Sequence, residues 1–209
     1  MLKIAVLVSG GGTNLQALID AQKRGEIPGG ELALVVAGKP GIFALERARE
    51  AGIPSRVLRK KEFPSQEAYD DAMIAALEEA GIGLVVLAGF LTIIGEKVIR
   101  RFENRILNIH PSLIPSFCGP GFYGLRVHEA ALERGVKVTG ATVHFVNEIC
   151  DGGPIVFQKP VAVLEGDTPE ILQRRVMEQA EWEILPRAVA LFCAGRLEIR
   201  GGLVRVLDE

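Results

Sequence analysis

The stretch "LKIAVLVSGGGTNLQALID", residues 2–20, decides the fold expected for this chain. Residues 2–8 form a continuous aliphatic run that predicts a buried strand, and three glycines follow it. Leu15 and Ile19 then recur at helical spacing, which predicts a helix over residues 14–25. A strand, a glycine-rich turn and a helix in this order open a doubly wound α/β sheet, in which helices cover both faces of parallel strands.

The same alternation continues through the first half of the chain. The pattern predicts further strands at 31–38, 55–58, 84–89 and 105–109, and further helices at 42–52 and 65–81. The strand at 84–89 is apolar on both faces, as expected in a parallel sheet with helices on each side.

The pattern changes after residue 125. A helix is predicted at 126–135, and two strands at 139–146 and 153–164 are joined by a link that favours antiparallel pairing. A long helix from about Pro169 to Phe192, bent at Pro186, and a hairpin over residues 197 to 206 complete the chain. We expect a single domain over residues 1–209, a Rossmann-like, mostly parallel sheet with an antiparallel edge.

Composition excludes several classes of protein. A hydrophobic fraction of 48% and a charged fraction of 24% are those of a globular chain and exclude a disordered one. A net charge of -2 provides no general field to attract nucleic acid or an anionic membrane. The longest uncharged run, residues 81–95, is 15 residues long. That is shorter than the roughly 18 residues that suggest a membrane span.

The cysteines and histidines predict no metal site. Cys118, Cys150 and Cys193 are widely separated and form no C-x-x-C, and the histidines show no H-x-x-x-H spacing. An odd number of cysteines suits a reducing compartment. We therefore expect a soluble, cytoplasmic protein with no metal and no disulfide framework.

The glycine-rich turn is a candidate anion site, because successive glycines let backbone N–H groups approach a ligand. The dinucleotide fingerprint is only partly met, since Leu15 stands in place of the third glycine and Lys39 in place of the acidic residue after the second strand. A phosphate on a single nucleotide or sugar suits the turn better than NAD does. The alternative is a plain sharp turn, with Thr13 or Asn14 capping the helix.

Polar side chains end the strand at 105–109. Asn108 and His110 are two residues apart, so they point the same way from the carboxyl end of the strand, where ligands bind in open α/β sheets. The carboxamide can donate to an oxyanion and the imidazole can shuttle a proton. Asp151, followed by two glycines, could hold the imidazole and favour its protonated form. Alternatively, the polar pair only ends the strand and Asp-Gly-Gly is only a turn.

Four segments resemble the phosphoribosylglycinamide formyltransferases, the folate-dependent enzymes of purine synthesis. These segments are "LVSGGGTNLQALID", "VVLAGFLTII", "LNIHPSLIPSF" and "DGGPIV". The resemblance spans nearly the whole chain. Its most specific element, N-x-H-P-S-L-x-P with a distant Asp, is shared by formyltetrahydrofolate-using hydrolases and transferases more widely, and the glycine loop then selects within that group.

The resemblance implies a role for each group of residues. The ribonucleotide would be bound by Gly12, Thr13, Asn14 and Glu181. The folate would be bound by Leu91, Thr92, Ile93, Ile94 and Asn108. The catalytic set would be Asn108, His110 and Asp151. An amine would attack the formyl carbon of 10-formyltetrahydrofolate, and Asn108 and protonated His110 would stabilise the oxyanion while Asp151 orients His110.

The chain departs from some family members, which carry Arg where this chain has Thr92 and Gln66; each loss removes a cation that could meet substrate phosphate or folate carboxylates. His128 and His144 are expected to be structural. The glycine- and proline-rich loop at 115–124 is either a mobile lid or a surface excursion.

Rival interpretations remain. A tRNA-formylating relative would need a further C-terminal domain, and a formyltetrahydrofolate hydrolase normally carries an N-terminal regulatory domain. The hydrolase is the nearest enzymatic rival, and a non-catalytic nucleotide-binding homologue is the rival from another class. The expected partners are glycinamide ribonucleotide and the formyl folate, and the oligomeric state stays open.

Overall fold

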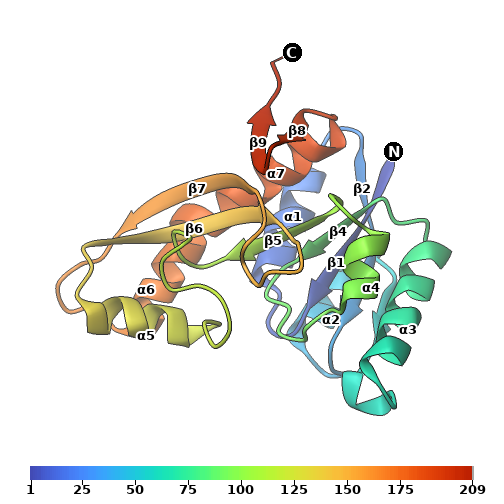
Figure 1. Cartoon of the computed structure of the whole chain (residues 1–209), viewed down its shortest axis with the longest axis horizontal. Helices are drawn as coiled ribbons and strands as arrows, with labels where there is room; N and C mark the ends of the chain where they lie inside the picture. Colours follow the sequence, from blue (N-terminus) through green and yellow to red (C-terminus); the bar gives the residue numbers. More distant parts are fainter. Residues whose placement is uncertain (209) are drawn as a thin grey trace. The chain divides into compact units, whose positions relative to one another are not determined.

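The computed structural model describes residues 1–208 (Figure 1). Its strands follow the order β3-β2-β1-β4-β5-β6-β7 in a seven-stranded sheet, and β8 and β9 form a separate pair. The chain divides into two compact units, residues 1–107 and the residues from 108 onward. The strand β5 (Ile106–His110) contains the boundary between them.

The first unit alternates strands and helices. Its elements are β1 (Leu2–Val8), α1 (Thr13–Lys23), β2 (Gly30–Ala37), α2 (Phe43–Glu50), β3 (Ser55–Val57), a 3-10 turn (Lys60–Glu62), α3 (Gln66–Glu79), β4 (Leu84–Leu87) and α4 (Glu96–Arg101). The strand β1 pairs in parallel with β2 on one side and β4 on the other, and β2 pairs in parallel with β3.

Helices sandwich the parallel strands of this unit. The helices α1 and α2 pack together, and α3 and α4 pack together, as Figure 1 shows for the second pair. Because parallel crossovers are right-handed, the connections that run toward β3 lie on one face and those that run back past β1 lie on the other. Residues 4–8 of β1 and 84–86 of β4 are fully buried between the two helix layers, which explains their unbroken apolar sequence.

The second unit contains α5 (Leu125–Arg134), β6 (Val138–Phe145), β7 (Ile155–Ala162), α6 (Pro169–Val176), a π-helical turn (Met177–Glu181), α7 (Trp182–Cys193), β8 (Leu197–Arg200) and β9 (Leu203–Val206). The strands β6 and β7 are antiparallel, and β8 and β9 form the expected hairpin. The helix α6 packs beside α5, and α7 packs on β7 and β6 (Figure 1).

The expected fold class, a mostly parallel doubly wound sheet with an antiparallel edge, is confirmed. The chain widens into a π turn at Met177–Glu181, which the sequence pattern did not predict, and Pro186 lies inside α7, where the expected bend stays a prediction. The proline ring collides with a carbonyl of the preceding turn in a regular helix, and a wider turn just upstream relieves this without breaking the helix.

The single domain expected over residues 1–209 stays a prediction. Within residues 1–208, no helix combines the length and the apolar character needed to cross a membrane.

Candidate active site

The glycine loop (residues 9–12) connects β1 to α1. Gly12 has φ of 72°, and a Cβ there would lie 2.7 Å from the Cβ of Ala44, so the fold itself requires this glycine. At Gly10 and Gly11 a Cβ would meet nothing within 4 Å, and neither residue has a positive φ. Internal packing therefore explains one of the three glycines, and the other two leave open space over the loop.

The protein holds the carbonyls of this loop. The carbonyl of Gly10 accepts from the Ala44 N–H at 3.3 Å, and that of Gly12 accepts from the Gln16 N–H at 2.9 Å. The Gly11 carbonyl accepts from Nε of Arg47 at 2.8 Å. Hydrogen bonds within the protein thus occupy these three carbonyls. The groups of the loop that are left for a ligand are the backbone N–H groups at the N-terminus of a helix, an arrangement that suits an anion.

Sequence reasoning missed Arg47, which is 36 residues away from Gly11 along the chain. Its guanidinium also donates to Oε1 of Gln16 at 2.8 Å and so ties α2 to the start of α1. Gly12 occupies the N-cap position of α1 with no side-chain cap. The alternative in which Thr13 or Asn14 occupies the cap position is therefore wrong, because Gly12 holds that position.

A second loop of this unit, the apolar loop (residues 89–95), is anchored at both ends. The N–H of Leu91 donates to Oγ of Ser9 at 2.9 Å, and the N–H of Gly95 donates to Oδ1 of the buried Asp70 at 3.0 Å. Leu91 is 59% exposed and Ile93 is 76% exposed. Apolar side chains held at the surface by a fixed backbone are a candidate contact for an apolar ligand ring.

The two positions that depart from some family members differ in their surroundings. Nε2 of Gln66 donates to Oδ1 of Asp70 at 2.6 Å, so Gln66 supports the anchor of the apolar loop. Thr92 lies within that loop. Leu91, Thr92, Ile93 and Ile94 thus share one anchored segment, in which Ile94 turns inward and is buried.

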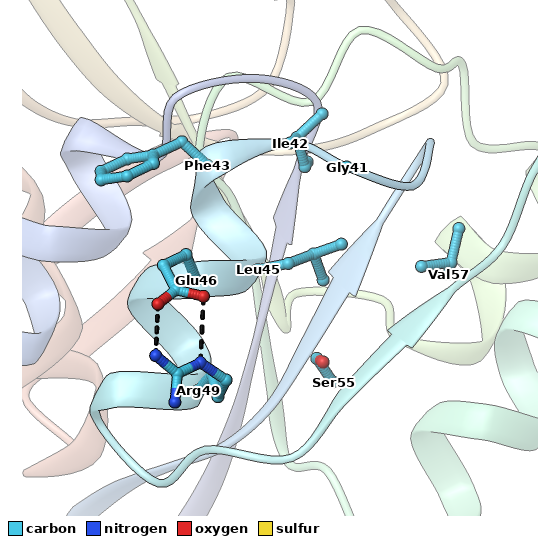
Figure 2. Close-up of a pocket in the computed structure, with 8 residues that line it drawn as sticks. All are labelled: Gly41, Ile42, Phe43, Leu45, Glu46, Arg49, Ser55 and Val57. Carbon is cyan, nitrogen blue, oxygen red and sulfur yellow. Dashed lines mark hydrogen bonds and ion pairs between the residues drawn. The ribbon is translucent and has the colours of Figure 1, made fainter.

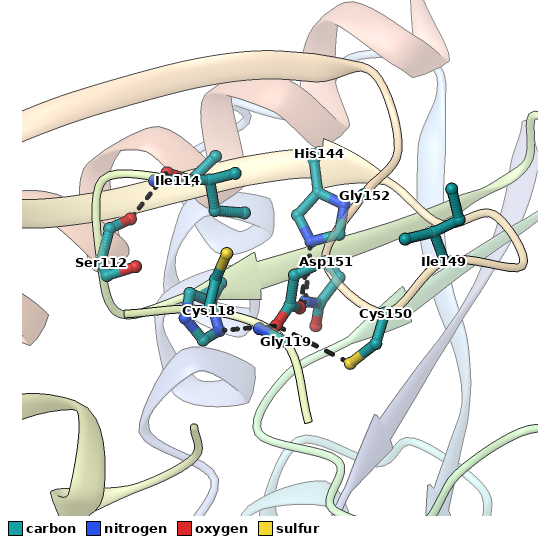
Figure 3. A network of polar contacts seen from close by, with 12 residues as sticks. Ser112, Ile114, Cys118, Gly119, His144, Ile149, Cys150, Asp151 and Gly152 are labelled. Carbon is teal, nitrogen blue, oxygen red and sulfur yellow. Dashed lines mark hydrogen bonds and ion pairs between the residues drawn. The ribbon is translucent and has the colours of Figure 1, made fainter. Parts of the chain in front are cut away.

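The strand-end cluster consists of Asn108, His110, His144 and Asp151, all in the second unit. Figure 3 shows His144 and Asp151 of this cluster side by side. Nδ1 of His110 lies 3.6 Å from Oδ2 of Asp151, and Nδ2 of Asn108 lies 3.4 Å from Oδ1 of the same carboxylate. The three residues predicted as the catalytic set are therefore brought together around one carboxylate. His144, which was expected to be structural, joins them, because its Nε2 lies 3.0 Å from Nδ2 of Asn108.

Asp151 is held in an unusual backbone position between β6 and β7. Its φ is 54°, which is uncommon for a residue other than glycine. A Cβ at Gly152 would lie 2.5 Å from Cγ2 of Ile149, and a Cβ at Gly153 would lie 1.8 Å from the carbonyl oxygen of Phe145. Both glycines are thus required to fold the link tightly enough to place the carboxylate.

The electrostatics keep Asp151 charged. Burial alone would raise its pKa, but the contact with His144, the charge of His110 and the Gly119 N–H at 2.8 Å outweigh burial. Together they lower the pKa of Asp151 to about 2. The carboxylate is consequently ionised throughout the physiological range.

Two opposing effects act on His110. Burial lowers its pKa, and neither the charge of Asp151 nor the hydrogen bond to the Phe117 carbonyl fully compensates. Asp151 does favour the protonated form of His110, as expected, but the cost of desolvating the imidazolium is larger, so the pKa is lowered. Nε2 of His110 lies 2.9 Å from the Phe117 oxygen, which can only accept, so the neutral ring carries its proton on Nε2.

Glu181 ends the π-helical turn and is only 6% exposed. π turns are rare and occur frequently at functional sites. Its role in binding the ribonucleotide stays a prediction. Across residues 1–208, no three His, Cys, Asp or Glu side chains are grouped so as to hold a metal ion.

A separate hollow of about 530 Å³ lies beside α2 and β3 in the first unit (Figure 2). Phe43, Leu45 and Val57 supply much of its apolar lining. Its two charged lining residues, Glu46 and Arg49, form an ion pair with each other. None of the predicted site residues is among those that line it, so it forms no part of the candidate site.

Comparisons with known proteins place the chain in a family. The model of the formyl transferase family matches residues 2–189. The chain is 42% identical over 203 residues to phosphoribosylglycinamide formyltransferase of Haemophilus influenzae, covering 97% of this chain and 92% of that protein. It is 45% identical over 198 residues to the trifunctional purine biosynthetic protein adenosine-3 of Gallus gallus, covering 95% of this chain. It spans only 19% of that longer protein.

Solved structures agree. Glycinamide ribonucleotide transformylase 1 from Symbiobacterium toebii superposes with a TM-score of 0.93 at 47% identity, covering 100% of this chain and 95% of that one. A formyltetrahydrofolate deformylase from Pseudomonas syringae shares the fold, with a TM-score of 0.85 at 23% identity over 99% of this chain and 66% of that one. The chain therefore belongs to the formyl transferase family, and within it to the phosphoribosylglycinamide formyltransferases.

Proposed function

We propose that this chain transfers the formyl group of 10-formyltetrahydrofolate to the amine of 5-phosphoribosylglycinamide, a step of purine biosynthesis. The observation that carries the proposal is the strand-end cluster, in which a carboxamide, an imidazole and an ionised carboxylate meet within 3.6 Å in a chain of this family. This chemistry needs proton transfer and oxyanion stabilisation, which these three groups provide.

The reaction passes through a tetrahedral intermediate. The substrate amine attacks the formyl carbon, a C–N bond forms, and the formyl oxygen becomes an oxyanion. An N–H of Asn108 donates to that oxygen, and His110 contributes a second donor once it is protonated. Removing one such donor typically costs about 10² to 10³ in turnover, so Asn108 alone accounts for a substantial part of the rate enhancement.

Proton transfer falls to His110. Because its pKa is lowered, the ring is neutral before reaction and can accept the proton that the attacking amine must lose. The imidazolium that forms is stabilised by the charge of Asp151, and it then returns the proton to the folate nitrogen as the C–N bond to the folate breaks. Asp151 stays ionised throughout, which its pKa of about 2 supports.

The remaining roles concern binding. The start of α1, with Gly12, Thr13 and Asn14, holds the ribonucleotide phosphate, and Glu181 contacts the ribonucleotide. The open space over Gly10 and Gly11 supports this assignment. The folate contacts Asn108 and the anchored segment that contains Leu91, Thr92, Ile93 and Ile94, whose exposed apolar side chains suit a pterin ring.

Nε2 of His110 faces the Phe117 carbonyl and Nδ1 faces Asp151, so His110 can exchange a proton with substrate only if one of these two neighbours gives way. Asp151 is fixed by its tight link, whereas the Phe117 carbonyl belongs to the loop toward Gly124, in which Gly119, Gly121 and Gly124 have positive φ. We infer that this loop releases His110 when folate binds. Limited proteolysis in the loop should therefore change when folate is added, and cleavage that is unaffected would argue against such movement.

The test of the proposed function is absorbance-monitored release of tetrahydrofolate from 10-formyltetrahydrofolate by the purified protein, with and without glycinamide ribonucleotide. Release that requires the ribonucleotide is the expected result. Release without it would identify a hydrolase, which shares the fold. No release in either case from folded protein would favour a non-catalytic nucleotide-binding homologue.

A further inference from the structure

The three carbonyls of the glycine loop have different donors, and only one of these donors is a side chain. Backbone N–H groups hold the carbonyls of Gly10 and Gly12. Nε of Arg47 holds the carbonyl of Gly11 at 2.8 Å. Because the guanidinium is charged, this bond is of a stronger kind than the two backbone bonds. A substitution at Arg47 therefore removes one contact of the loop and leaves the other two in place.

The carbonyl of Gly11 and the N–H of Gly12 belong to the same peptide group. A peptide group is planar and trans, so its C=O and N–H bonds point in opposite directions. Because Arg47 holds the Gly11 carbonyl on the side of α2, the Gly12 N–H is turned to the opposite side of the loop. Gly12 caps α1, and backbone N–H groups at a helix N-terminus attract anions. The guanidinium thus sets the direction of one donor of the predicted phosphate site.

Further contacts fix the guanidinium itself. It donates to Oε1 of Gln16 at 2.8 Å, and Nε2 of Gln16 donates in turn to Oδ1 of Asp20 at 2.8 Å. The second bond orients the carboxamide of Gln16, because a carboxylate accepts only from the amide nitrogen. Cζ of Arg47 also lies 4.8 Å from the centroid of the Phe43 ring, a cation–π contact. A side chain held at so many points can direct a loop with little freedom of its own.

The two arginines of α2 differ in what surrounds their charge. Both hydrogen-bond acceptors of Arg47, the carbonyl of Gly11 and the carboxamide of Gln16, are neutral. They leave its charge in place, so the guanidinium adds positive potential beside the loop. Arg49 instead pairs with Glu46, as Figure 2 shows. Arg49 is therefore a matched control for substitutions at Arg47.

We propose that Arg47 is a positioning residue for the phosphate of the ribonucleotide, which holds the Gly11 carbonyl so that the Gly12 N–H is directed at the phosphate. The inference rests on the proposed function and deepens it. Arg47 acts through the backbone of the glycine loop and takes no part in formyl transfer. Its loss should weaken binding of the ribonucleotide and spare the chemical step.

The first experiment compares Arg47→Met with Arg49→Met in the full chain. Methionine keeps an unbranched side chain and removes the donors and the charge. We expect Arg47→Met to raise the KM for the ribonucleotide about tenfold, the effect of losing one charge-assisted hydrogen bond. The kcat and the KM for the folate should change less than about twofold. Arg49→Met should leave all three values unchanged, and urea unfolding confirms that both variants are folded.

Arg47→Lys separates position from charge. Lysine keeps the positive charge but lacks the planar fork that holds two acceptors at once. It should recover less than about half of the loss in KM on a logarithmic scale. Full recovery would show that the charge alone matters and would overturn the positioning role. A loss in kcat with an unchanged KM for the ribonucleotide would overturn it too.

The second experiment observes the loop directly by NMR, with inorganic phosphate titrated to saturation into isotope-labelled protein. A hydrogen bond to phosphate moves an amide proton downfield. In the unaltered protein and in Arg49→Met, we expect the amide proton of Gly12 to move in this way. In Arg47→Met its shift should fall by more than about half, whereas any shift at Gly11 should persist, because the N–H of Ala44 still holds that peptide group. An equal Gly12 shift in Arg47→Met and Arg49→Met would overturn the inference.

Failure of the inference can be told apart from failure of the proposed function. A protein whose Gly12 amide responds to phosphate through Arg47, but which transfers no formyl group, would overturn the function and leave Arg47 as the organiser of a phosphate site. Turnover that requires the ribonucleotide, with no response of Gly12 to phosphate in the unaltered protein, would overturn the inference alone. If Arg47→Met fails to fold, Arg47→Lys is compared with Arg49→Lys in the NMR experiment, where an equal Gly12 shift again overturns the positioning role.

Discussion

In the glycine loop the chain exposes its backbone, whereas in the strand-end cluster it encloses side chains. A Cβ at Gly10 or Gly11 would meet open space, and the loop carbonyls are held by the protein. In the cluster, His110 and His144 are buried and converge with Asn108 on one carboxylate. Substitutions that add atoms to the glycine loop should therefore impair its function, whereas the strand-end cluster should be impaired by substitutions that remove atoms or charges.

The largest effect is expected from removing the charge of the cluster. Asp151→Asn preserves the shape of the side chain and tolerates the positive φ, but it removes the charge that stabilises the His110 imidazolium. We expect kcat to fall by about 10² to 10⁴, the usual worth of acid–base catalysis, with far smaller changes in KM. Steady-state kinetics with both substrates measures this.

Asp167→Asn is the matched control, because Asp167 is also a nearly buried carboxylate of the second unit, but it pairs with Arg175. It should affect stability and leave kcat unchanged. Unchanged turnover in Asp151→Asn would remove Asp151 from the mechanism and would leave the cluster as a structural network.

The next largest effect concerns the loss of folding stability at acidic pH. Buried imidazoles should cause such a loss, whereas a loop that exposes only its backbone should not. His128 is fully buried, and burial lowers its pKa from 6.5 to about 4. Between these values the unfolded chain binds a proton that the folded chain does not, so stability falls as the pH drops from 6.5 to 4. The loss amounts to about 3 kcal/mol for this residue.

Urea unfolding at pH 7 and at pH 4.5 tests this. His128→Gln should remove most of the difference between the two pH values, and His110, whose pKa is also lowered, should account for much of the remainder. The lowered pKa of Asp151 acts only below about pH 4, outside this window. An identical pH dependence in His128→Gln and the unaltered protein would show that His128 is not buried in its neutral form.

These residues also show how far sequence reasoning reaches. Asn108, His110 and Asp151 lie in short local patterns, so they could be predicted as a set, and the alternation of strands and helices was sufficient for the fold class. Arg47 and His144 could not be predicted. Each has its partner 36 residues away in the chain, so no local pattern joins the two residues of either contact.

The glycine loop itself gives a smaller and separable pair of effects. Gly11→Ala adds a methyl group toward open space, so we expect unchanged stability, within about 0.5 kcal/mol, but an increase of roughly tenfold in the KM for the ribonucleotide, worth about 1.4 kcal/mol. Gly12→Ala should instead destabilise the fold by about 1 to 3 kcal/mol, because its φ is positive and Ala44 blocks the new Cβ.

Kinetics and urea unfolding on both variants separate the two roles. A Gly11→Ala protein with normal KM would show that the open space over the loop is not used by the ribonucleotide. A Gly12→Ala protein of normal stability would show that the loop can relax away from Ala44.

The smallest effect is expected at Ser9, where a side chain of the glycine loop supports the apolar loop. Ser9→Ala removes the acceptor of the Leu91 N–H, a hydrogen bond worth about 1 kcal/mol, and should raise the KM for the folate a few-fold with kcat little changed. Ser65→Ala is the matched control, since it also removes a hydroxyl that accepts from a backbone N–H, that of Ala68 at the start of α3. Both variants should lose similar stability, so a folate effect confined to Ser9→Ala would show that the backbone loop and the apolar loop act together. Equal KM values in the two variants would instead mean that the apolar loop keeps its shape without the Ser9 hydroxyl, and that the two loops of the first unit act independently.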